Sequence, residues 1–178
     1  RDTCAEILGL EAGKLRVIER RTMASPVHRD LQQLLPMLES LCDDWRDQLN
    51  GIGIATTGLV SDDDVYFISV GADQRLAVQA QLRQSFAVPV VVLNDAWAAA
   101  WAEYCLGGHA AAKTLVYLTL STGIGGGVVY NGQLLTSPRG FAGHLGHLNI
   151  PRADGASFSC SCGRVNCIEA IASGTAIS

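Results

Sequence analysis

This sequence lacks an excess of positive charge, long apolar runs and a leader-like opening. The 17 Asp and Glu residues outnumber the 13 Lys and Arg residues, and the formal net charge of -4 provides no basic surface for nucleic acid or anionic lipid. The apolar stretches end well short of the ~18–20 residues that a membrane-spanning helix needs. No charged and then apolar signal peptide begins the chain. We therefore expect a cytoplasmic protein with neither a nucleic-acid partner nor a membrane partner.

Familiar nucleotide-binding motifs are absent as well. The chain has neither G-x-x-x-x-G-K-[ST] nor a G-x-G-x-x-G that follows a strand, which argues against a Walker-type site and a Rossmann unit. It also lacks internal repeats, low-complexity runs and proline-rich linkers. What remains is a chain of 178 residues, 48% of them hydrophobic, which is enough for one or two globular lobes with buried cores.

Strand-like and helix-like segments alternate along the chain. A turn at residues 11–14 between two strand-like stretches predicts a β-hairpin, and Asn131-Gly132 predicts another. Further buried strands are expected at 51–58, 89–95 and 114–120, and helices at 30–49, 75–86 and 96–107. The alternation predicts an α/β fold. We place a lobe boundary within residues 107–113, so that residues 1–113 form one lobe and residues 114–178 begin a second.

Half of the cysteines lie close together near the end of the chain. Cys160, Cys162 and Cys167 fall within eight positions, downstream of His144 and His147. In a reducing compartment, clustered cysteines more often bind a metal than form disulfides. A structural zinc takes four Cys or His ligands, and either histidine is a candidate for the fourth position. The alternative is three free thiols, whereas redox chemistry is less favoured because C-x-x-C spacing is absent.

A glycine-rich turn is a candidate for holding phosphate. Ser121, Thr122 and Gly123 follow a predicted strand and precede three glycines at 125–127. Exposed amides of such a turn, with hydroxyls beside them, can bind phosphate oxygens. Alternatively, the glycines serve only the geometry of a bulged hairpin.

An acidic residue stands where a predicted strand gives way to a helix. Asp95, preceded by Asn94, occupies this junction. One interpretation is a helix N-cap, which is a common structural role. The other is a carboxylate at the carboxyl end of a strand, where α/β proteins bind their ligands.

Four segments, in matching order over residues 50–178, resemble the ROK family of sugar kinases and sugar-responsive repressors. They read GIGIATTG, VVVLNDAWAAAWAE, LTLSTGIGGGVVYNGQLLTS and GHLGHLNI followed by CSCGRVNCIEAIASG. The last is the most specific, because it matches the C-x-C-G-x-x-[GN]-C-x-E zinc loop of that family. The resemblance implies an actin-like ATPase (ribonuclease H-like) α/β fold, with mixed sheets flanked by helices.

The resemblance also implies an activity. It points to ATP-dependent phosphorylation of the 6-hydroxyl of an amino-hexose, with N-acetylmannosamine as the first candidate. ATP, Mg²⁺ and a structural Zn²⁺ are the cofactors it implies, and a homodimer is the expected assembly. The alternatives are the sugar-sensing domain of a ROK repressor and a catalytically degenerate homologue.

Individual residues take roles from the matching motifs. Asp95 is the implied catalytic base. The implied zinc ligands are His147, Cys160, Cys162 and Cys167. The implied sugar-binding residues are Gly58, Asn94, Asp95, His144, His147 and Glu169, and the implied phosphate-binding residues are Ser121, Thr122 and Gly123.

The chain also departs from the family pattern at both ends. Family kinases begin with a strand that runs into Asp-x-Gly-Gly-Thr, a first phosphate loop, and no such motif occurs here. The sequence stops at Ser178, where the second lobe of family kinases continues. We therefore expect either a fragment of a kinase, with a truncated second lobe, or a reduced relative.

Overall fold

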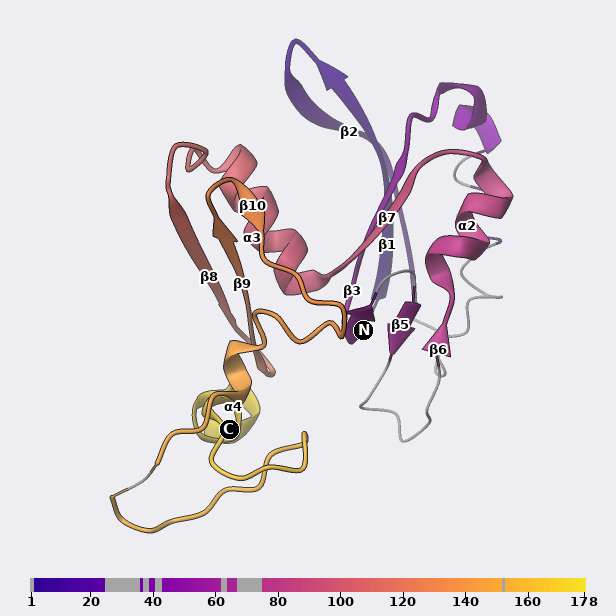
Figure 1. Ribbon diagram of the computed structural model, residues 1–178. Helices are drawn as coiled ribbons and strands as arrows, with labels where there is room; N and C mark the ends of the chain where they lie inside the picture. The colour runs from indigo at the N-terminus through magenta and orange to yellow at the C-terminus, as the bar shows by residue number, and fades with distance from the viewer. Residues whose placement is uncertain are drawn as a thin grey trace. The chain divides into compact units, whose positions relative to one another are not determined.

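The structure, a computed structural model, describes residues 2–24, 36, 39–40, 43–61, 64–66, 75–151 and 153–178. The chain divides into two compact units (Figure 1). One comprises residues 1–53 and 76–91, and the other comprises residues 54–75 and 92–178. These compact units are not the two lobes expected from the sequence. The lobe boundary within residues 107–113 stays a prediction.

The first unit contains a long β-hairpin. Strands β1 (Asp2–Glu11) and β2 (Lys14–Ala24) pair antiparallel, with a bulge between Ile7 and Leu8. Ala12 and Gly13 turn the chain with φ angles of 48° and 77°, the left-handed backbone that two-residue hairpin loops require. The hairpin expected from the sequence is therefore confirmed.

Helix α2 (Val78–Phe86) supplies much of the apolar packing in the same unit. It buries Val78, Leu82 and Phe86, and the guanidinium of Arg46 lies over the Phe86 ring at 5.2 Å from the centroid. Arg46 belongs to a 3-10 helix, η1 (Asp43–Gln48). The helix expected at 75–86 is confirmed from Val78 onward, because Arg75–Leu76 form a short strand, β6. Half of the helix expected at 30–49 lies outside the described residues, and residues 43–48 near its expected end form the 3-10 helix η1 rather than an α-helix.

Short strands form two further sheets. Strands β3 (Ile52–Thr56) and β7 (Val90–Asn94) are paired neighbours. Strands β4 (Leu59–Ser61) and β5 (Asp64–Tyr66) pair antiparallel, with β6 on the far side of β5. Strands therefore form at both expected places, 51–58 and 89–95, but the expected burial is only partial. No residue of β3 is buried, and Val91 in β7 is 54% exposed.

The second unit is built on a three-stranded antiparallel sheet covered by one helix. The sheet order is β10-β9-β8, from β8 (Thr114–Leu120), β9 (Ile124–Tyr130) and β10 (Gln133–Leu134). Asn131 and Gly132 form the β9–β10 turn with positive φ angles, as the sequence predicts. Helix α3 (Asp95–Leu106) packs along one face of this sheet (Figure 1).

The glycines of β9 let α3 approach closely. A Cβ atom on Gly127 would lie 2.6 Å from the Cβ of Ala100 and 3.0 Å from the backbone oxygen of Ala96. The pairing of β8 with β9 runs without a register shift, so the bulge considered for this stretch is absent. The glycines of β9 and the alanines of α3 therefore form a close helix–sheet contact that leaves no room for larger side chains.

Strand β8 is not buried on both faces, which corrects the expectation for residues 114–120. Val116, Leu118 and Leu120 are 56%, 52% and 70% exposed, because α3 covers only the opposite face of the sheet. Leu145 covers part of the outer face near Gly126. Every position of the run TLVYLTL except the two threonines and the tyrosine is aliphatic, so its pattern cannot reveal which face is open.

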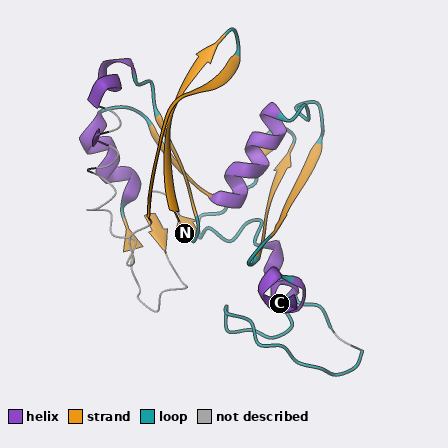
Figure 2. Ribbon diagram, turned by 180° about the vertical axis from the view of Figure 1, so that it is seen from behind, coloured by secondary structure: helices purple, strands orange, loops and turns teal. Residues whose placement is uncertain are grey.

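The end of the chain is mostly loop. The short helices η3 (Leu145–His147), α4 (Ile168–Ala172) and α5 (Gly174–Ile177) flank it, and loop occupies most of residues 148–167 (Figure 2). Two isolated bridges, Asn149–Cys167 and Ser159–Val165, hold the loop together. Among the described residues, no helix combines the length and the apolar character needed to span a membrane.

Candidate active site and metal centre

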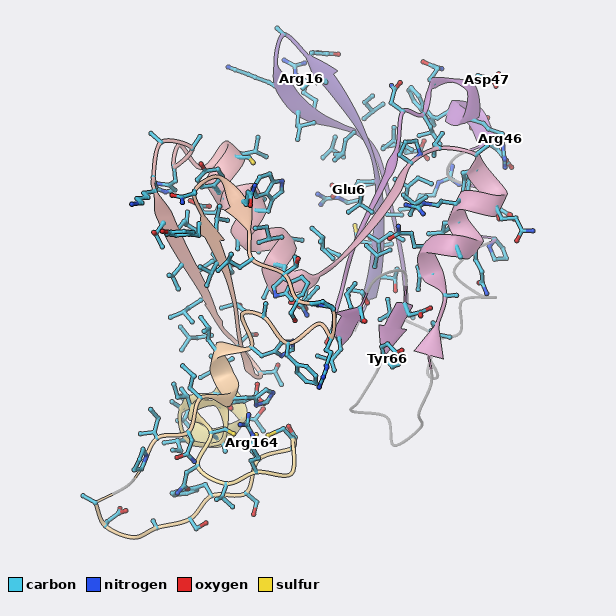
Figure 3. The ribbon with its side chains drawn as sticks, in the orientation of Figure 1. Glu6, Arg16, Arg46, Asp47, Tyr66 and Arg164 are labelled. Atoms are coloured by element: carbon cyan, nitrogen blue, oxygen red, sulfur yellow. The ribbon has the colours of Figure 1, made fainter. Side chains whose placement is uncertain are left out.

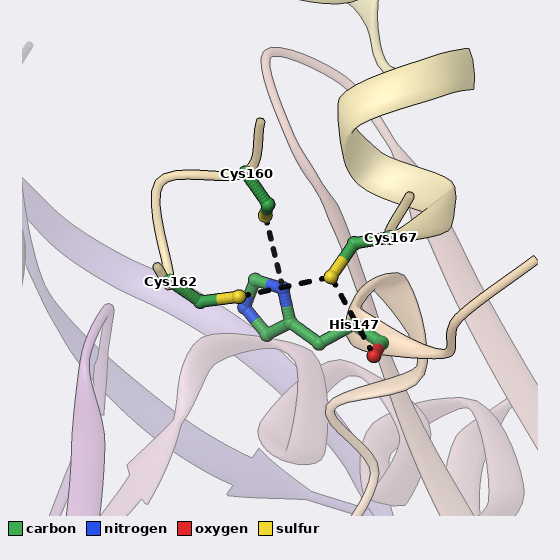
Figure 4. A group of neighbouring side chains, drawn as sticks. All are labelled: His147, Cys160, Cys162 and Cys167. Carbon is green, nitrogen blue, oxygen red and sulfur yellow. Dashed lines mark hydrogen bonds between the residues drawn. The ribbon is translucent and has the colours of Figure 1, made fainter. Parts of the chain in front are cut away.

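Four side chains converge beside the cysteine loop (Figure 4). One nitrogen of His147 and the sulfurs of Cys160, Cys162 and Cys167 all lie within 4.8 Å of one another. His147 is the last residue of η3, and Asn149, two residues later, forms an isolated β-bridge with Cys167. This bridge brings the cysteine loop next to His147. The sequence expectation named these four residues, and the structure gathers them into one cluster.

The separations within the cluster suit a tetrahedral metal. The Sγ atoms of Cys162 and Cys167 are 3.7 Å apart, and Cys160 Sγ lies 3.6 Å from the Nδ1 atom of His147. With Zn–S near 2.3 Å and Zn–N near 2.05 Å, a regular tetrahedron has S···S edges of about 3.8 Å and S···N edges of about 3.6 Å. The donor set therefore suits a zinc ion, and these two separations match those of a tetrahedral site.

The backbone around the cluster is fixed by its own hydrogen bonds. The amide of Cys160 donates to Arg164 O at 2.8 Å, and the amide of Gly163 donates to Cys160 O at 3.0 Å. Gly163 has a φ angle of 84°, which the tight turn between Cys162 and Arg164 requires. The guanidinium of Arg164 donates to the backbone oxygen of His147 at 2.9 Å. This arginine links the cysteine turn to η3.

The thiols of the cluster differ in acidity. A hydrogen bond from the Arg164 backbone amide is the main cause that lowers the pKa of Cys162 to about 7. Burial is the main cause that raises the pKa of Cys167 to about 11. Metals bind the thiolate, so Cys162 is the readiest to ligate at neutral pH, and a bound cation would have to stabilise the Cys167 thiolate.

His144 lies next to this cluster with a polar atom unused. Its Nε2 atom is buried and makes no hydrogen bond within the part of the chain that is described. Its ring stacks on that of His147, with centroids 6.1 Å apart. Burial, followed by the charge of His147, lowers the pKa of His144, while the negative charges of Asp95 and Glu169 oppose this shift. The pKa of His144 therefore lies below that of an ordinary histidine, although Asp95 and Glu169 lie close enough to act on it electrostatically.

Asn94, rather than Asp95, is the N-cap of α3. The Oδ1 atom of buried Asn94 accepts hydrogen bonds from the amides of Ala96 and Trp97, and its Nδ2 atom donates to Gly58 O at 3.0 Å. Strand β7 ends at Asn94, so the N-cap lies one residue before Asp95, the residue that the sequence suggests for this role. Asp95 occupies the first helical position with its side chain exposed, and its Oδ1 accepts from the Ala96 amide at 2.9 Å.

Glu169 joins α4 to the glycine-rich turn. Its Oε2 atom accepts a hydrogen bond from the amide of Ile124 at 2.9 Å, and it lies where a Cβ on Gly123 would be only 2.6 Å away. The turn is also bound to α5, because the amide of Gly174 donates to Ser121 O. The amides of Thr122 and Gly123 donate to no acceptor in the described part of the chain. They remain available for an anion.

The structure thus collects most of the residues that the sequence nominated. His147 and the three cysteines form one group, Asp95 and Glu169 act on His144, and Asn94 holds Gly58. The assigned roles of these residues stay predictions. Sequence reasoning missed Arg164, although its place inside the cysteine turn is a local signal. It also missed the hydrogen bond from Trp97 Nε1 to Ala142 O at 2.7 Å, which fixes the loop ahead of His144 and has no sequence signal.

The chain resembles known proteins along nearly its whole length. A sequence profile described as the ROK family matches residues 4–178. The N-acetylmannosamine kinases of Salmonella newport (strain SL254) and Salmonella typhi are each 38% identical over 166 residues, which is 90% of this chain and 55% of theirs. The chain therefore spans about half the length of these curated relatives.

Solved structures share the fold. A ROK hexokinase from Thermus thermophilus matches 99% of this chain and 61% of its own with 30% identity and a TM-score of 0.73. A ROK family transcriptional regulator, a homolog of the E. coli MLC protein, matches 90% of this chain and 42% of its own with 27% identity and a TM-score of 0.75. A ROK glucokinase from Streptomyces griseus in complex with glucose and AMPPNP matches 91% of this chain and 52% of its own with 29% identity and a TM-score of 0.69. The expected actin-like α/β fold is confirmed.

Proposed function

The chain belongs to the ROK family, and from this membership we propose that it is part of a sugar kinase. The proposed reaction transfers the γ-phosphate of ATP to the 6-hydroxyl of an amino-hexose, with N-acetylmannosamine as the first candidate. The observation that carries the proposal is the half-buried His144, whose buried Nε2 atom has no hydrogen-bond partner among the described residues and whose pKa responds to the charges of Asp95 and Glu169. A hydroxyl-rich ligand would satisfy that atom.

Asp95 is the proposed general base. Its carboxylate is exposed and begins α3, while the neighbouring Asn94 is fixed by the helix cap and by Gly58. Asp95 would take the proton of the 6-hydroxyl as that oxygen attacks phosphorus. Phosphoryl transfer needs mainly positioning and charge stabilisation, so one placed carboxylate is a sufficient acid–base group.

The remaining polar groups are proposed to position the two substrates. His144 Nε2, Glu169 and the neighbourhood of Gly58 and Asn94 would hold the sugar. His147 was also expected to touch the sugar, and this remains a proposal beside its metal role. The unpaired amides of Thr122 and Gly123, with the hydroxyl of Ser121 next to them, would bind phosphate oxygens of ATP together with Mg²⁺.

The cysteine cluster is proposed to hold a structural Zn²⁺ through His147 Nδ1 and three thiolates. The ion would supply no chemistry to the sugar, because all four positions are filled by the protein. Cys167 directly precedes α4, which carries Glu169. Fixing Cys167 therefore fixes the start of α4 and, through Glu169, the turn at Gly123.

A second candidate function rests on the likeness to the MLC-related regulator. A sugar-sensing domain would use the same sugar contacts and zinc loop without phosphoryl transfer. The observations that favour the kinase are the identity to N-acetylmannosamine kinases and the available amides of the glycine-rich turn.

Calorimetric titration of the zinc-loaded chain with N-acetylmannosamine and with ATP–Mg²⁺ separates the two. Heat of binding from both ligands supports the kinase, and binding of sugar alone supports the sensor. Binding of neither ligand contradicts both. Light scattering after size exclusion tests the expected homodimer in the same preparation.

A further inference from the structure

A small cavity opens on the β4–β5 hairpin, and none of its lining residues belongs to the proposed sugar, phosphate or metal sites. Its volume is about 210 Å³, and it is lined by Leu59, Ser61, Tyr66 and Arg139. Pockets for drug-sized ligands measure ~300–1,000 Å³, so this one suits a group of only a few atoms. Leu59 pairs directly with Tyr66, and Ser61 lies two residues along, so three of the four side chains share one face of the hairpin. Tyr66 is labelled on β5 in Figure 3.

The fourth residue, Arg139, is held against this face by its neighbours on both sides. The hydroxyl of Ser61 donates a hydrogen bond to the backbone oxygen of Pro138. On the other side, Gly140 packs so tightly on β4 that a Cβ atom there would lie 2.6 Å from Val60 O. Its φ angle of 73° makes the position doubly suited to glycine. The backbone that carries Arg139 therefore lies directly on β4.

Two of the polar groups at this cavity have no partner in the part of the chain that the structure describes. Within the described residues, neither the guanidinium of Arg139 nor the phenol of Tyr66 takes part in a hydrogen bond or an ion pair. Asp64 pairs with Ser61 across the hairpin, but it is buried, has an interaction of its own and does not line the cavity. The cavity thus offers one positive charge and one hydroxyl donor beside the apolar side chain of Leu59.

We propose that this cavity binds an oxyanion, that is, a phosphate or carboxylate group of a small ligand. The planar guanidinium of Arg139 pairs with two oxygens of such a group, and the Tyr66 hydroxyl donates to one of them. The Ser61 hydroxyl already donates its hydrogen to the backbone oxygen of Pro138, so Ser61 lines the cavity without donating a hydrogen bond to the anion. The site adjoins Gly58 in sequence, but its ligand is an anion rather than the neutral amino sugar.

An NMR titration tests this proposal without any need for catalysis. The ¹⁵N-labelled, zinc-loaded chain is titrated with sodium phosphate and, separately, with sodium acetate, and sodium chloride keeps the ionic strength constant. We expect saturable shifts of the amides of Val60, Ser61 and Tyr66 with at least one anion. Arg139→Gln should abolish them, and Tyr66→Phe should weaken binding about tenfold, as expected for one hydrogen bond to a charged group.

Arg16→Gln is the matched control. Arg16 is an exposed arginine on the β1–β2 hairpin, so its loss removes one positive charge at another place and should leave the titration unchanged. Saturation with phosphate alone or with acetate alone supports the proposal and identifies the anion. The proposal is wrong if neither anion gives saturable shifts, or if Arg139→Gln binds the anion with unchanged affinity. Neither result depends on whether the chain phosphorylates a sugar.

Discussion

The carboxylate of Glu169 accepts a hydrogen bond from the amide of Ile124 at 2.9 Å, across 45 positions of sequence. The contact connects α4, which begins after Cys167, to the turn at Ser121–Gly123. A structural change in the cysteine loop can therefore displace the residues of this turn, none of which is a proposed metal ligand. This mechanical link makes the metal proposal testable through ligand binding as well as through metal content.

Removing one cysteine should impair metal binding and sugar binding together. Cys162→Ser leaves three donors, and we expect zinc affinity to fall by more than the ~10–100-fold that follows loss of a group that merely orients a ligand. Elemental analysis after dialysis measures zinc, and calorimetry measures N-acetylmannosamine binding. Cys105→Ser, at an exposed thiol outside the cluster, is the control. Stoichiometric zinc in Cys162→Ser would show that this thiol is not a ligand.

The metal-free protein should show an ordered pattern of thiol reactivity. Cys162 is exposed and its pKa is about 7, whereas Cys167 is buried and its pKa is about 11, so iodoacetamide should modify Cys162 well before Cys167. Because the thiolate reacts, the rate at Cys162 should fall as the pH drops below about 7. Peptide mass spectrometry follows both sites. Added Zn²⁺ should protect the two thiols but leave the exposed Cys4 reactive, and equal labelling of Cys162 with and without zinc would speak against the site.

Loss of the proposed base should separate binding from turnover. Asp95→Asn keeps the size of the side chain and its hydrogen bond to the Ala96 amide, so sugar affinity should change little. Turnover with ATP and N-acetylmannosamine should fall ~10²–10⁴-fold, the usual contribution of a general base. Asp47→Asn, at an exposed position of η1, controls for loss of a surface charge. Turnover close to that of the parent would assign Asp95 a purely structural place at the start of α3.

Turn chemistry and ligand spacing made much of this structure predictable. Two hairpins follow from Gly13 and from Asn131-Gly132, where positive φ angles are needed. The spacing of Cys160, Cys162 and Cys167 similarly anticipates a cluster, since a short turn cannot keep these thiols far apart.

Other features depend on contacts that no local pattern encodes. Asn94 and Asp95 are both good caps, and only the last residue of β7 decides which one serves. The approach of Nδ1, rather than Nε2, of His147 to Cys160 depends on how η3 meets the loop. For the glycines at 125–127 the sequence suggests phosphate binding or a bulge, whereas in the structure Gly125 and Gly127 lie against alanines of α3 and Gly126 lies against Leu145.

His144 should serve the sugar and not the metal. In His144→Ala the unpaired Nε2 atom is lost, so the apparent KM for N-acetylmannosamine should rise about tenfold or more, as for one buried hydrogen bond. Zinc content should stay at one per chain, because His147 and three cysteines already complete the set. His144→Gln, which retains a donor and an acceptor, should recover part of the affinity. A zinc-deficient His144→Ala protein would mean that this histidine is a ligand.

The close contact between α3 and β9 should be sensitive to a single methyl group. In Gly127→Ala the new Cβ would lie 2.6 Å from Ala100 Cβ and 3.0 Å from Ala96 O, and backbone cannot yield as a flexible side chain does. Overpacking of this kind costs ~1–3 kcal/mol, so urea unfolding should shift to a lower midpoint. Gly53→Ala is the matched control, because nothing lies within 4 Å of its new Cβ and alanine costs less than glycine to order in a strand. Since α3 begins at Asp95 and Ala96, displacement of the helix should also lower turnover. Equal stability of the two variants would contradict the account of why β9 is rich in glycine.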